Sequence, residues 1–334
     1  MRFIRQRRAD RVVGALLGMG ALAPLVVVVG LLSYLVESSW PVWRMMGWHF
    51  FTGQLWNLGN LYAARPAIVH GVPVMPGASF GALVFILGTA LTSFMALALA
   101  VPLGFFVAAA SGYFVHGRWR VVMAGLVEMM AGIPSVIFGL WGLMVVAPAW
   151  AHHVGPLLNR VLHHLPFFTG PVQSETNLTV AVVVITLMIV PIIAATIRAV
   201  MERVPRELVE SGLALGWTEA ETFWRLVWPY ARSAVIGGAI LGLGRALGET
   251  MAVLMVSGDA LNVLPRNIYS SISTMAATIA GQLDAALTDP TKMAIHALGA
   301  LGLVLFAATF VVNILARVIV NRSTAQLRAV TKNG

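Results

Sequence analysis

Residues 205–229 read PRELVESGLALGWTEAETFWRLVWP, a polar stretch between two apolar ones. The residues after Pro205 suit a short helix, and Gly216 suits its C-terminal cap because glycine enters the left-handed region without strain. Thr218 and Glu221 have the spacing of a Thr-x-x-Glu capping box, which opens a second helix. Pro229 then ends that helix or begins the return to the membrane. The pattern predicts a helix, a glycine turn and a helix, which is either a well-capped surface loop or a rigid unit that docks on a soluble partner.

The composition excludes a soluble protein. Of the 334 residues, 59% are hydrophobic and only 10% are charged, whereas soluble domains carry about 25% charge. The chain has no cysteine, which excludes disulfides, thiol nucleophiles and cysteine-bound metals. The net charge of +9 comes from basic residues beside apolar runs, so it indicates a membrane surface and not nucleic acid.

Six apolar runs have the length of membrane-spanning helices, which need about 20 residues. Several contain proline, which is tolerated where neighbouring helices satisfy the freed carbonyl. The first run is too long for a signal peptide, so we expect it to be retained. The expected spans are Val12–Leu35, Phe80–Ala110, Val121–Trp150 (interrupted by Pro134 and Pro148), Leu178–Val200 (with Pro191), Ala234–Val256 and Met293–Val320.

The distribution of basic residues predicts the orientation. With the N-terminus inside, most of the 22 Lys and Arg residues lie in inner segments, as the positive-inside rule requires. We therefore expect both termini in the cytoplasm. The expected outer segments carry only Arg44, Arg65, Arg160, Arg266 and Lys292.

Two ionisable residues lie inside the fifth expected span, in the sequence GLGRALGETMA over 242–252. Arg245 and Glu249 are four residues apart, so on one helix they would share a face and neutralise each other. Such residues usually face a bundle interior or a water path. An arginine fork suits phosphate or another oxyanion, although a structural ion pair would have the same pattern. Glycine pairs at 238 and 242, and at 244 and 248, favour close helix packing.

The spacing within 205–229 resembles the EAA loop of ABC importer permeases. Glu210, Gly216 and Pro229 match that pattern in identity and spacing, and Gly212 keeps a small residue where the pattern has alanine. The resemblance implies that this loop is the coupling helix that seats on the ATP-hydrolysing subunit.

The run around Arg245, with Glu128-x5-Pro134-Ser135 before it, is similar to phosphate-specific ABC importer permeases of the PstC subunit type. The resemblance covers nearly the whole chain. It implies the type I ABC importer (MetI-like) fold, with Arg245 and Glu249 near the translocation path. The implied partners are a second permease of the PstA type, two ATP-binding subunits of the PstB type and a periplasmic phosphate-binding protein of the PstS type. ATP and Mg²⁺ would bind the partner ATPase, with no cofactor, metal or catalytic residue in this chain.

Glu128 is a third carboxylate in an apolar region. It could pair with a polar group in the bundle, with Arg245 as one candidate, or lie near the cytoplasmic end in water. A structural role is the preferred interpretation, with a role in the pathway as the alternative.

Three other patterns in the sequence have alternative interpretations. Residues 77–81 match Gly-x-Ser-x-Gly, and a rhomboid-like intramembrane protease would use Ser79 with His296; the plainer interpretation is a helix start capped by Ser79. The adjacent histidines at 152–153 and 163–164 favour a polar outer loop over a metal site. The only lysines are Lys292 and Lys332, and no P-loop is present, so the energy source lies elsewhere.

The sequence therefore predicts an all-α, polytopic protein of the bacterial inner membrane with six transmembrane helices. Its function would be phosphate import, with another oxyanion (sulfate, molybdate or phosphonate) as the alternative substrate. The expected organisation is an inner N-terminus and first span over 1–36, a periplasmic segment over 37–79, a permease core over 80–322 with its coupling loop at 201–233, and a cytoplasmic tail over 323–334.

Overall fold

The computed structural model describes residues 2–170 and 174–332, and within them the chain is almost entirely helical. Two short antiparallel pairs are the exception: β1 (Trp56–Asn57) with β4 (Ser79–Phe80), and β2 (Ala67–Val69) with β3 (Val72–Val74). The expectation of an all-α fold is confirmed. The helices are α1 (Arg2–Met46), α2 (His49–Thr52), α3 (Leu83–Ala109), α4 (Arg118–Gly132), α5 (Ser135–Trp141), α6 (Ala147–Ala149), α7 (Gly155–Leu162), α8 (Leu178–Met201), α9 (Arg206–Ala214), α10 (Glu219–Thr222), α11 (Trp228–Leu247), α12 (Met251–Val256), α13 (Met275–Gly281), α14 (Leu283–Leu287) and α15 (Met293–Lys332).

Within the described residues, six helical stretches are long and apolar enough to cross a membrane, which confirms the expected number. Some of them join two or more helices through π-helical turns, which widen the helix without ending it. The stretches are Leu17–Met46, Leu83–Phe114, Ser135–Leu162, Leu178–Met201, Glu219–Leu247 and Met293–Leu315.

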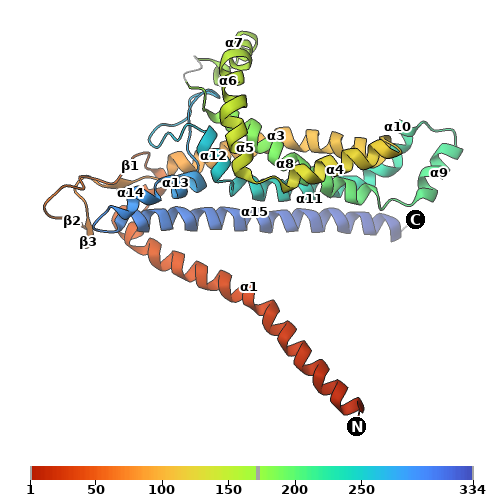
Figure 1. Ribbon diagram of the computed structural model, residues 1–334, viewed down its shortest axis with the longest axis horizontal. Helices are drawn as coiled ribbons and strands as arrows, with labels where there is room; N and C mark the ends of the chain where they lie inside the picture. Colours follow the sequence, from red (N-terminus) through yellow and green to blue (C-terminus); the bar gives the residue numbers. More distant parts are fainter. Residues whose placement is uncertain (1, 171–173, 333–334) are drawn as a thin grey trace.

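The core of the bundle forms around α8, which packs against α3 and α11 (Figure 1). The most apolar window of α8 is 67% buried, whereas that of α1 is 0% buried. Glycines bring the neighbours close, because a Cβ on Gly104 would lie 2.7 Å from Ile193 and one on Gly242 would lie 3.0 Å from it. The expected packing role of Gly238 and Gly242 is thus confirmed, whereas Gly244 has no neighbour within 4 Å of such a Cβ.

The boundaries of the first two expected spans were wrong. The helix that begins the chain continues past Leu35 to Met46, because the Ser39 hydroxyl donates to the Leu35 carbonyl and Val42 and Met45 are buried. Part of the expected periplasmic segment is therefore helical. Ser79 does not cap a helix, because it lies in β4 and α3 starts only at Leu83.

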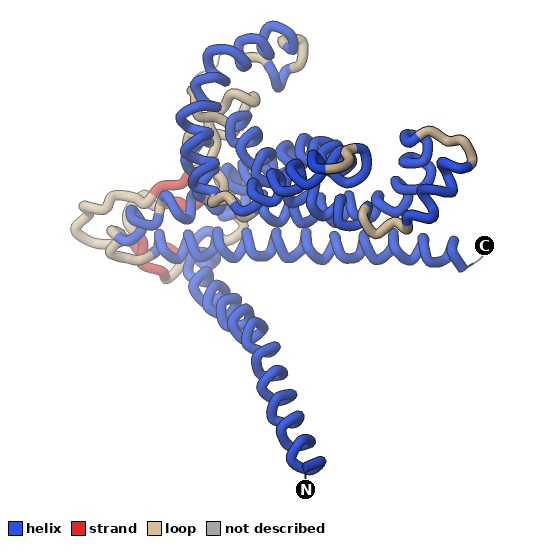
Figure 2. The backbone as a smooth tube through the Cα atoms, turned by 45° about the vertical axis from the view of Figure 1, so that its right-hand side comes forward, coloured by secondary structure: helices blue, strands red, loops and turns tan. Residues whose placement is uncertain are grey.

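The third expected span was also wrong. The chain is extended at Ile133 and Pro134, because the residue before a proline is disfavoured in the helical region. The break separates α4, which packs beside α8, from a second helical run that continues to Leu162. Figures 1 and 2 show α5–α7 leaving the bundle at a steep angle to α15.

The C-terminal end of α15 lies at the same end of the bundle as α9 and α10, whereas the short strands lie at the opposite end (Figures 1 and 2). The first helix joins α15 at the end that carries the strands and diverges from it towards the N-terminus. The bundle thus has one end built from the polar helix pair and one built from strands and short helices.

Candidate coupling loop and charged membrane helix

The stretch between α8 and α11 folds as the sequence predicts. The first helix, α9, begins after Pro205, and the chain then turns at Gly216 with φ of +83°. Thr218 caps the next helix with a complete capping box: its hydroxyl accepts from the Glu221 amide at 3.2 Å, and its own amide donates to the Glu221 carboxylate at 2.9 Å. The polar loop is therefore a defined pair of helices.

Gly212 sets how closely the two helices approach. It is buried, and a Cβ at this position would lie 3.1 Å from Cγ2 of Thr222 and 3.2 Å from Cδ1 of Leu226. Contacts this short are tighter than ordinary van der Waals packing. The small residue in the EAA-like pattern thus has a steric reason, which is the contact between α9 and the helix that follows.

Of the two alternatives for Pro229, the structure agrees with the second: Pro229 does not end the helix but lies where the chain returns to the membrane in α11. Helical structure continues from Glu219 to Leu247, with a π-helical turn at Phe223–Val227 that ends two residues before the proline. The Trp228 amide donates to the Phe223 carbonyl, five residues back. This wider turn accommodates the proline, which has no amide hydrogen to donate. The polar helix pair is consequently joined to the membrane helix α11 without a flexible link.

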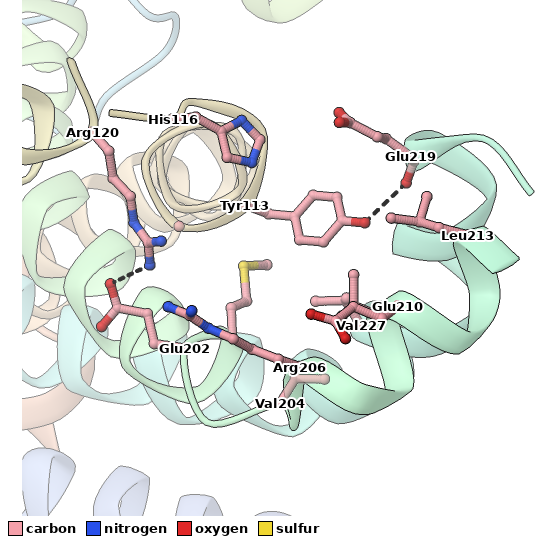
Figure 3. A pocket seen from close by; sticks show the side chains of 13 residues that line it. Tyr113, His116, Arg120, Glu202, Val204, Arg206, Glu210, Leu213, Glu219 and Val227 are labelled. Carbon is pink, nitrogen blue, oxygen red and sulfur yellow. Dashed lines mark hydrogen bonds and ion pairs between the residues drawn. The ribbon is translucent and has the colours of Figure 1, made fainter. Parts of the chain in front are cut away.

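A cavity of about 390 Å³ lies between the helix pair and the turn that connects α3 to α4 (Figure 3). Glu210 lines it from α9, and Tyr113 closes one side by donating from its hydroxyl to the Glu219 carbonyl at 3.2 Å. The Tyr113 ring also packs on Phe223, with ring centroids 5.2 Å apart. The lining residues are Gly112, Tyr113, His116, Arg120, Met201, Glu202, Val204, Arg206, Val209, Glu210, Leu213, Glu219 and Val227.

This cavity brings together residues that sequence reasoning did not single out. Tyr113 comes from the turn after α3 and Arg120 from α4, both far from Glu210 in the sequence, whereas Glu202 directly follows α8. No spacing rule connects them, because their proximity depends on the bundle. The predicted loop is therefore one wall of a larger charged site.

Arg245 and Glu249 do not lie on one helix. The helix α11 ends at Leu247, with Gly248 as its cap, and the chain re-enters a helix only at Met251. The i to i+4 geometry is lost at this break, so the expected ion pair was wrong: none joins the two residues among the ion pairs of the described chain. Arg245 is exposed in the isolated chain, whereas Glu249 is only 8% exposed.

The position of Arg245 has its own electrostatic basis. It lies in the last turn of α11, where free carbonyls give the helix end a partial negative charge. A cation there is favoured without a carboxylate partner. The arginine is thus placed at a helix interruption in the apolar part of the chain, with its side chain directed out of this subunit's core.

Glu128 pairs with Arg198 and not with Arg245. Its Oε1 lies 2.6 Å from Nη2 of Arg198, and its side chain is 64% exposed. Both residues lie at the end of the bundle that carries the polar helix pair, because Arg198 is in the last turn of α8. The structure thus favours the structural interpretation of Glu128.

The other motifs do not assemble into a catalytic or metal site in the part of the chain that is described. Nδ1 of His296 donates to the Ser38 carbonyl at 2.8 Å, and no hydrogen bond joins it to Ser79. His152 lies in a π-helical turn, where the sequence favoured a loop, and its Nε2 is 3.8 Å from the Glu175 carboxylate. No group of three potential metal ligands occurs among the described residues.

The fold has a counterpart among the solved structures of ABC transporters. It is similar to a chain in a crystal structure described as inward-facing conformations of the MetNI methionine ABC transporter. The match covers 71% of this chain and 93% of that one, with a TM-score of 0.50 and 15% identity. Residues 100–327 match the family described as binding-protein-dependent transport system inner membrane component. The chain belongs to this family, within its PstC-type permeases.

Curated relatives are similar over almost the whole chain. The phosphate transport system permease protein PstC 1 of Mycobacterium tuberculosis is 40% identical over 318 residues, which cover 94% of each protein. PstC of Mesorhizobium japonicum is 36% identical, covering 96% of this chain and 92% of the relative. PstC of Pasteurella multocida is 35% identical, covering 90% of this chain and 88% of the relative. The chain is therefore a multi-pass membrane protein of an ABC transport system.

Proposed function

We propose that this chain is the permease subunit of an ATP-driven importer that moves inorganic phosphate across the bacterial inner membrane. The observation that carries the proposal is the 40% identity to a phosphate transport permease over 94% of both chains, together with a coupling loop folded as that function requires. Arg245 fits the substrate, because a guanidinium fork can bind a phosphate through two oxygens.

The energy comes from a partner in this proposal. Two ATP-binding subunits of the PstB type bind ATP and Mg²⁺ and press on the helix pair, where Glu210, Gly212 and Gly216 shape the contact surface. The continuous helix from Glu219 to Leu247 then carries the displacement to Arg245. Pro229 lies within this rigid connection, so it belongs to the transmission and not to a hinge.

The rest of the complex follows from the same reasoning. A second permease of the PstA type covers the exposed face that carries Arg245, and a PstS-type binding protein delivers phosphate on the outer side. The helix pair faces the cytoplasm. Because the end of α15 lies at that same end of the bundle, the C-terminus is cytoplasmic. The N-terminus is also placed in the cytoplasm, because its basic residues follow the positive-inside rule.

In the transport cycle, Arg245 gives phosphate a transient counter-charge within the membrane. Glu249, buried beside the break in the helix, keeps that attraction from becoming a trap, because a nearby carboxylate repels the anion. Alternating access then requires that the helix pair and α11 move together relative to the rest of the bundle when ATP is bound and hydrolysed.

The test is uptake of radiolabelled phosphate by a bacterial strain that lacks this chain and other phosphate carriers. The strain is complemented with the wild type or with Arg245→Ala, and sulfate, molybdate and phosphonate are added as competitors. Uptake restored by the wild type and unaffected by competitors is the expected result. Inhibition by one competitor at equal concentration would assign the chain to that oxyanion instead. Failure of the wild type to restore any phosphate uptake would reject the proposal.

A further inference from the structure

Helix α4 is attached to the bundle in an unusual way. It packs along α8, yet none of its residues is buried in this structure. Partly buried side chains such as Val127 still pack against the core. The attachment of α4 also includes two ion pairs, through Arg120 and Glu128, which both lead to the last turn of α8 and the residue after it.

These contacts form a relay of four charges, Glu128–Arg198–Glu202–Arg120. Arg198 bonds Glu128 at 2.6 Å and lies 3.8 Å from Glu202 through Nε, while Arg120 bonds Glu202 at 3.1 Å. Figure 3 shows the last of these pairs at the edge of the cavity. The relay thus joins α4 to α8 at two points, which are about two turns of α4 apart.

Arg198 is the decisive member of the relay. Its side chain is only 13% exposed, and its Nη1 is buried without a hydrogen-bond partner among the described residues. Exposed ion pairs contribute little, but a buried guanidinium that loses its acceptor is costly. Because Glu128 gives Arg198 the one direct hydrogen bond to a carboxylate that it makes among the described residues, α4 is held where that carboxylate can reach.

The surroundings of Arg198 fix its direction. A Cβ on Gly112 would lie 3.1 Å from Cγ of Arg198, so the stem of the arginine passes directly over this glycine. Gly112 also lines the cavity beside the helix pair, as do Arg120 and Glu202. The relay and the predicted coupling loop are therefore two sides of one site.

The far end of α4 is a non-helical connection. The helix ends at Gly132, and the extended residues Ile133 and Pro134 separate it from α5. Neither has the helical dihedral angles that would couple the two helices rigidly. The helix α4 is consequently a rod that ends at a non-helical joint and carries ion pairs near its start, at Arg120, and about one turn before that joint, at Glu128.

We propose that Arg198 is a positioning residue, which holds α4 to the inner end of α8 so that α4 follows the coupling loop and pivots at Ile133–Pro134 during transport. The inference rests on the proposed function, since it assumes that the loop moves with ATP. It adds a second moving element, because α4 enters the cycle through the relay and not through the loop itself.

The first experiment measures two distances, one from α4 to α8 across the relay and one from α4 to α5 across the break at Ile133–Pro134. The chain has no cysteine, so Val122→Cys on α4 can be combined with Ala199→Cys on α8 or with Ile137→Cys on α5, all at exposed positions, to give two unique spin-label sites on it. In the reconstituted four-component importer, each distance distribution is recorded without nucleotide and with ATP under non-hydrolysing conditions. The α4–α5 distribution should change with ATP and the α4–α8 distribution should not. An α4–α5 distribution identical in both states would overturn the pivot, and an α4–α8 distribution that changes would overturn the attachment.

The second experiment tests the relay with charge-neutral variants. Glu128→Gln and Arg198→Gln should each broaden the α4–α8 distance distribution without nucleotide and raise the ATP consumed per phosphate about three- to fivefold. The double variant should be no worse than Arg198→Gln alone, and Arg198→Lys should restore part of the coupling. Additive effects, or a normal distribution in both single variants, would reject the role of Arg198.

Arg118→Gln is the matched control. It removes the same charge from the exposed start of the same helix, and Arg118 has no ion pair within the described part of the chain, so coupling and distance should stay as in the wild type. If the wild-type complex takes up no phosphate, this result counts against the proposed function but not against the role of Arg198. The label distances decide the inference in either case, because they respond to ATP and not to the transported ion.

Discussion

A Cβ atom on Gly212 would lie 3.1 Å from Cγ2 of Thr222, so α9 and the following helix touch where only a hydrogen atom fits. Replacing Gly212 with leucine should force the helices apart at a cost of about 1–3 kcal/mol. We expect ATP hydrolysis to continue while phosphate uptake falls severalfold, measured in reconstituted vesicles. Gly212→Ala is the graded control, with a smaller loss; equal, normal coupling in both variants would contradict this account of the contact.

Gly216 allows a test of backbone strain without steric interference. Its φ is +83°, and an added Cβ would have no neighbour within 4 Å. Gly216→Val should therefore lose coupling through the left-handed conformation alone, at about 1–2 kcal/mol. Gly216→Asn should stay near the wild type, because asparagine tolerates this region. The ratio of ATP hydrolysed to phosphate transported distinguishes them, and similar ratios would exclude strain as the cause.

Arg245→Ala should reduce phosphate uptake to background while the complex still assembles. The side chain is exposed in this chain and has no ion pair among the described residues, so its removal leaves no buried charge behind. Assembly is checked by size-exclusion chromatography of the purified complex. Arg232→Ala, at the exposed inner part of the same helix, is the control with normal uptake. Uptake by Arg245→Ala at the wild-type rate would remove Arg245 from the pathway.

Glu249→Gln should leave the fold intact, because glutamine has nearly the same size and the helix break depends on the backbone. Without the repelling carboxylate, phosphate should stay longer near Arg245, so we expect slower uptake and a lower half-saturating phosphate concentration. Initial rates at several phosphate concentrations separate these two effects. A raised half-saturating concentration would instead mean that Glu249 helps phosphate to bind.

The parts of the structure that depend on neighbouring residues were predictable. The capping box of Thr218 and the left-handed Gly216 each need only a few residues, and both formed as expected. The number of spans followed from apolar length alone. These features share one property, which is that their energies are determined within one or two helical turns.

The parts that were missed depend on the whole bundle. Sequence shows the glycines around Arg245, but it does not show that α11 stops at Gly248 and separates Arg245 from Glu249. Pro134 was predicted to interrupt the third span, yet its effect is larger than a kink, because α4 packs beside α8 while α5 turns away from the bundle. The partner of Glu128 is 70 residues distant in the sequence, and no pattern indicates such a contact.

The contact between α1 and α15 sets an order of events during synthesis. The Ser38 carbonyl accepts from His296, a residue 258 positions later, and the membrane-spanning part of α1 has almost no other cover in this chain. At about 5–20 residues per second, the first span waits roughly 10–50 s in the lipid before its partner helix is made. The oldest helix of the nascent chain is thus among the last to find its place.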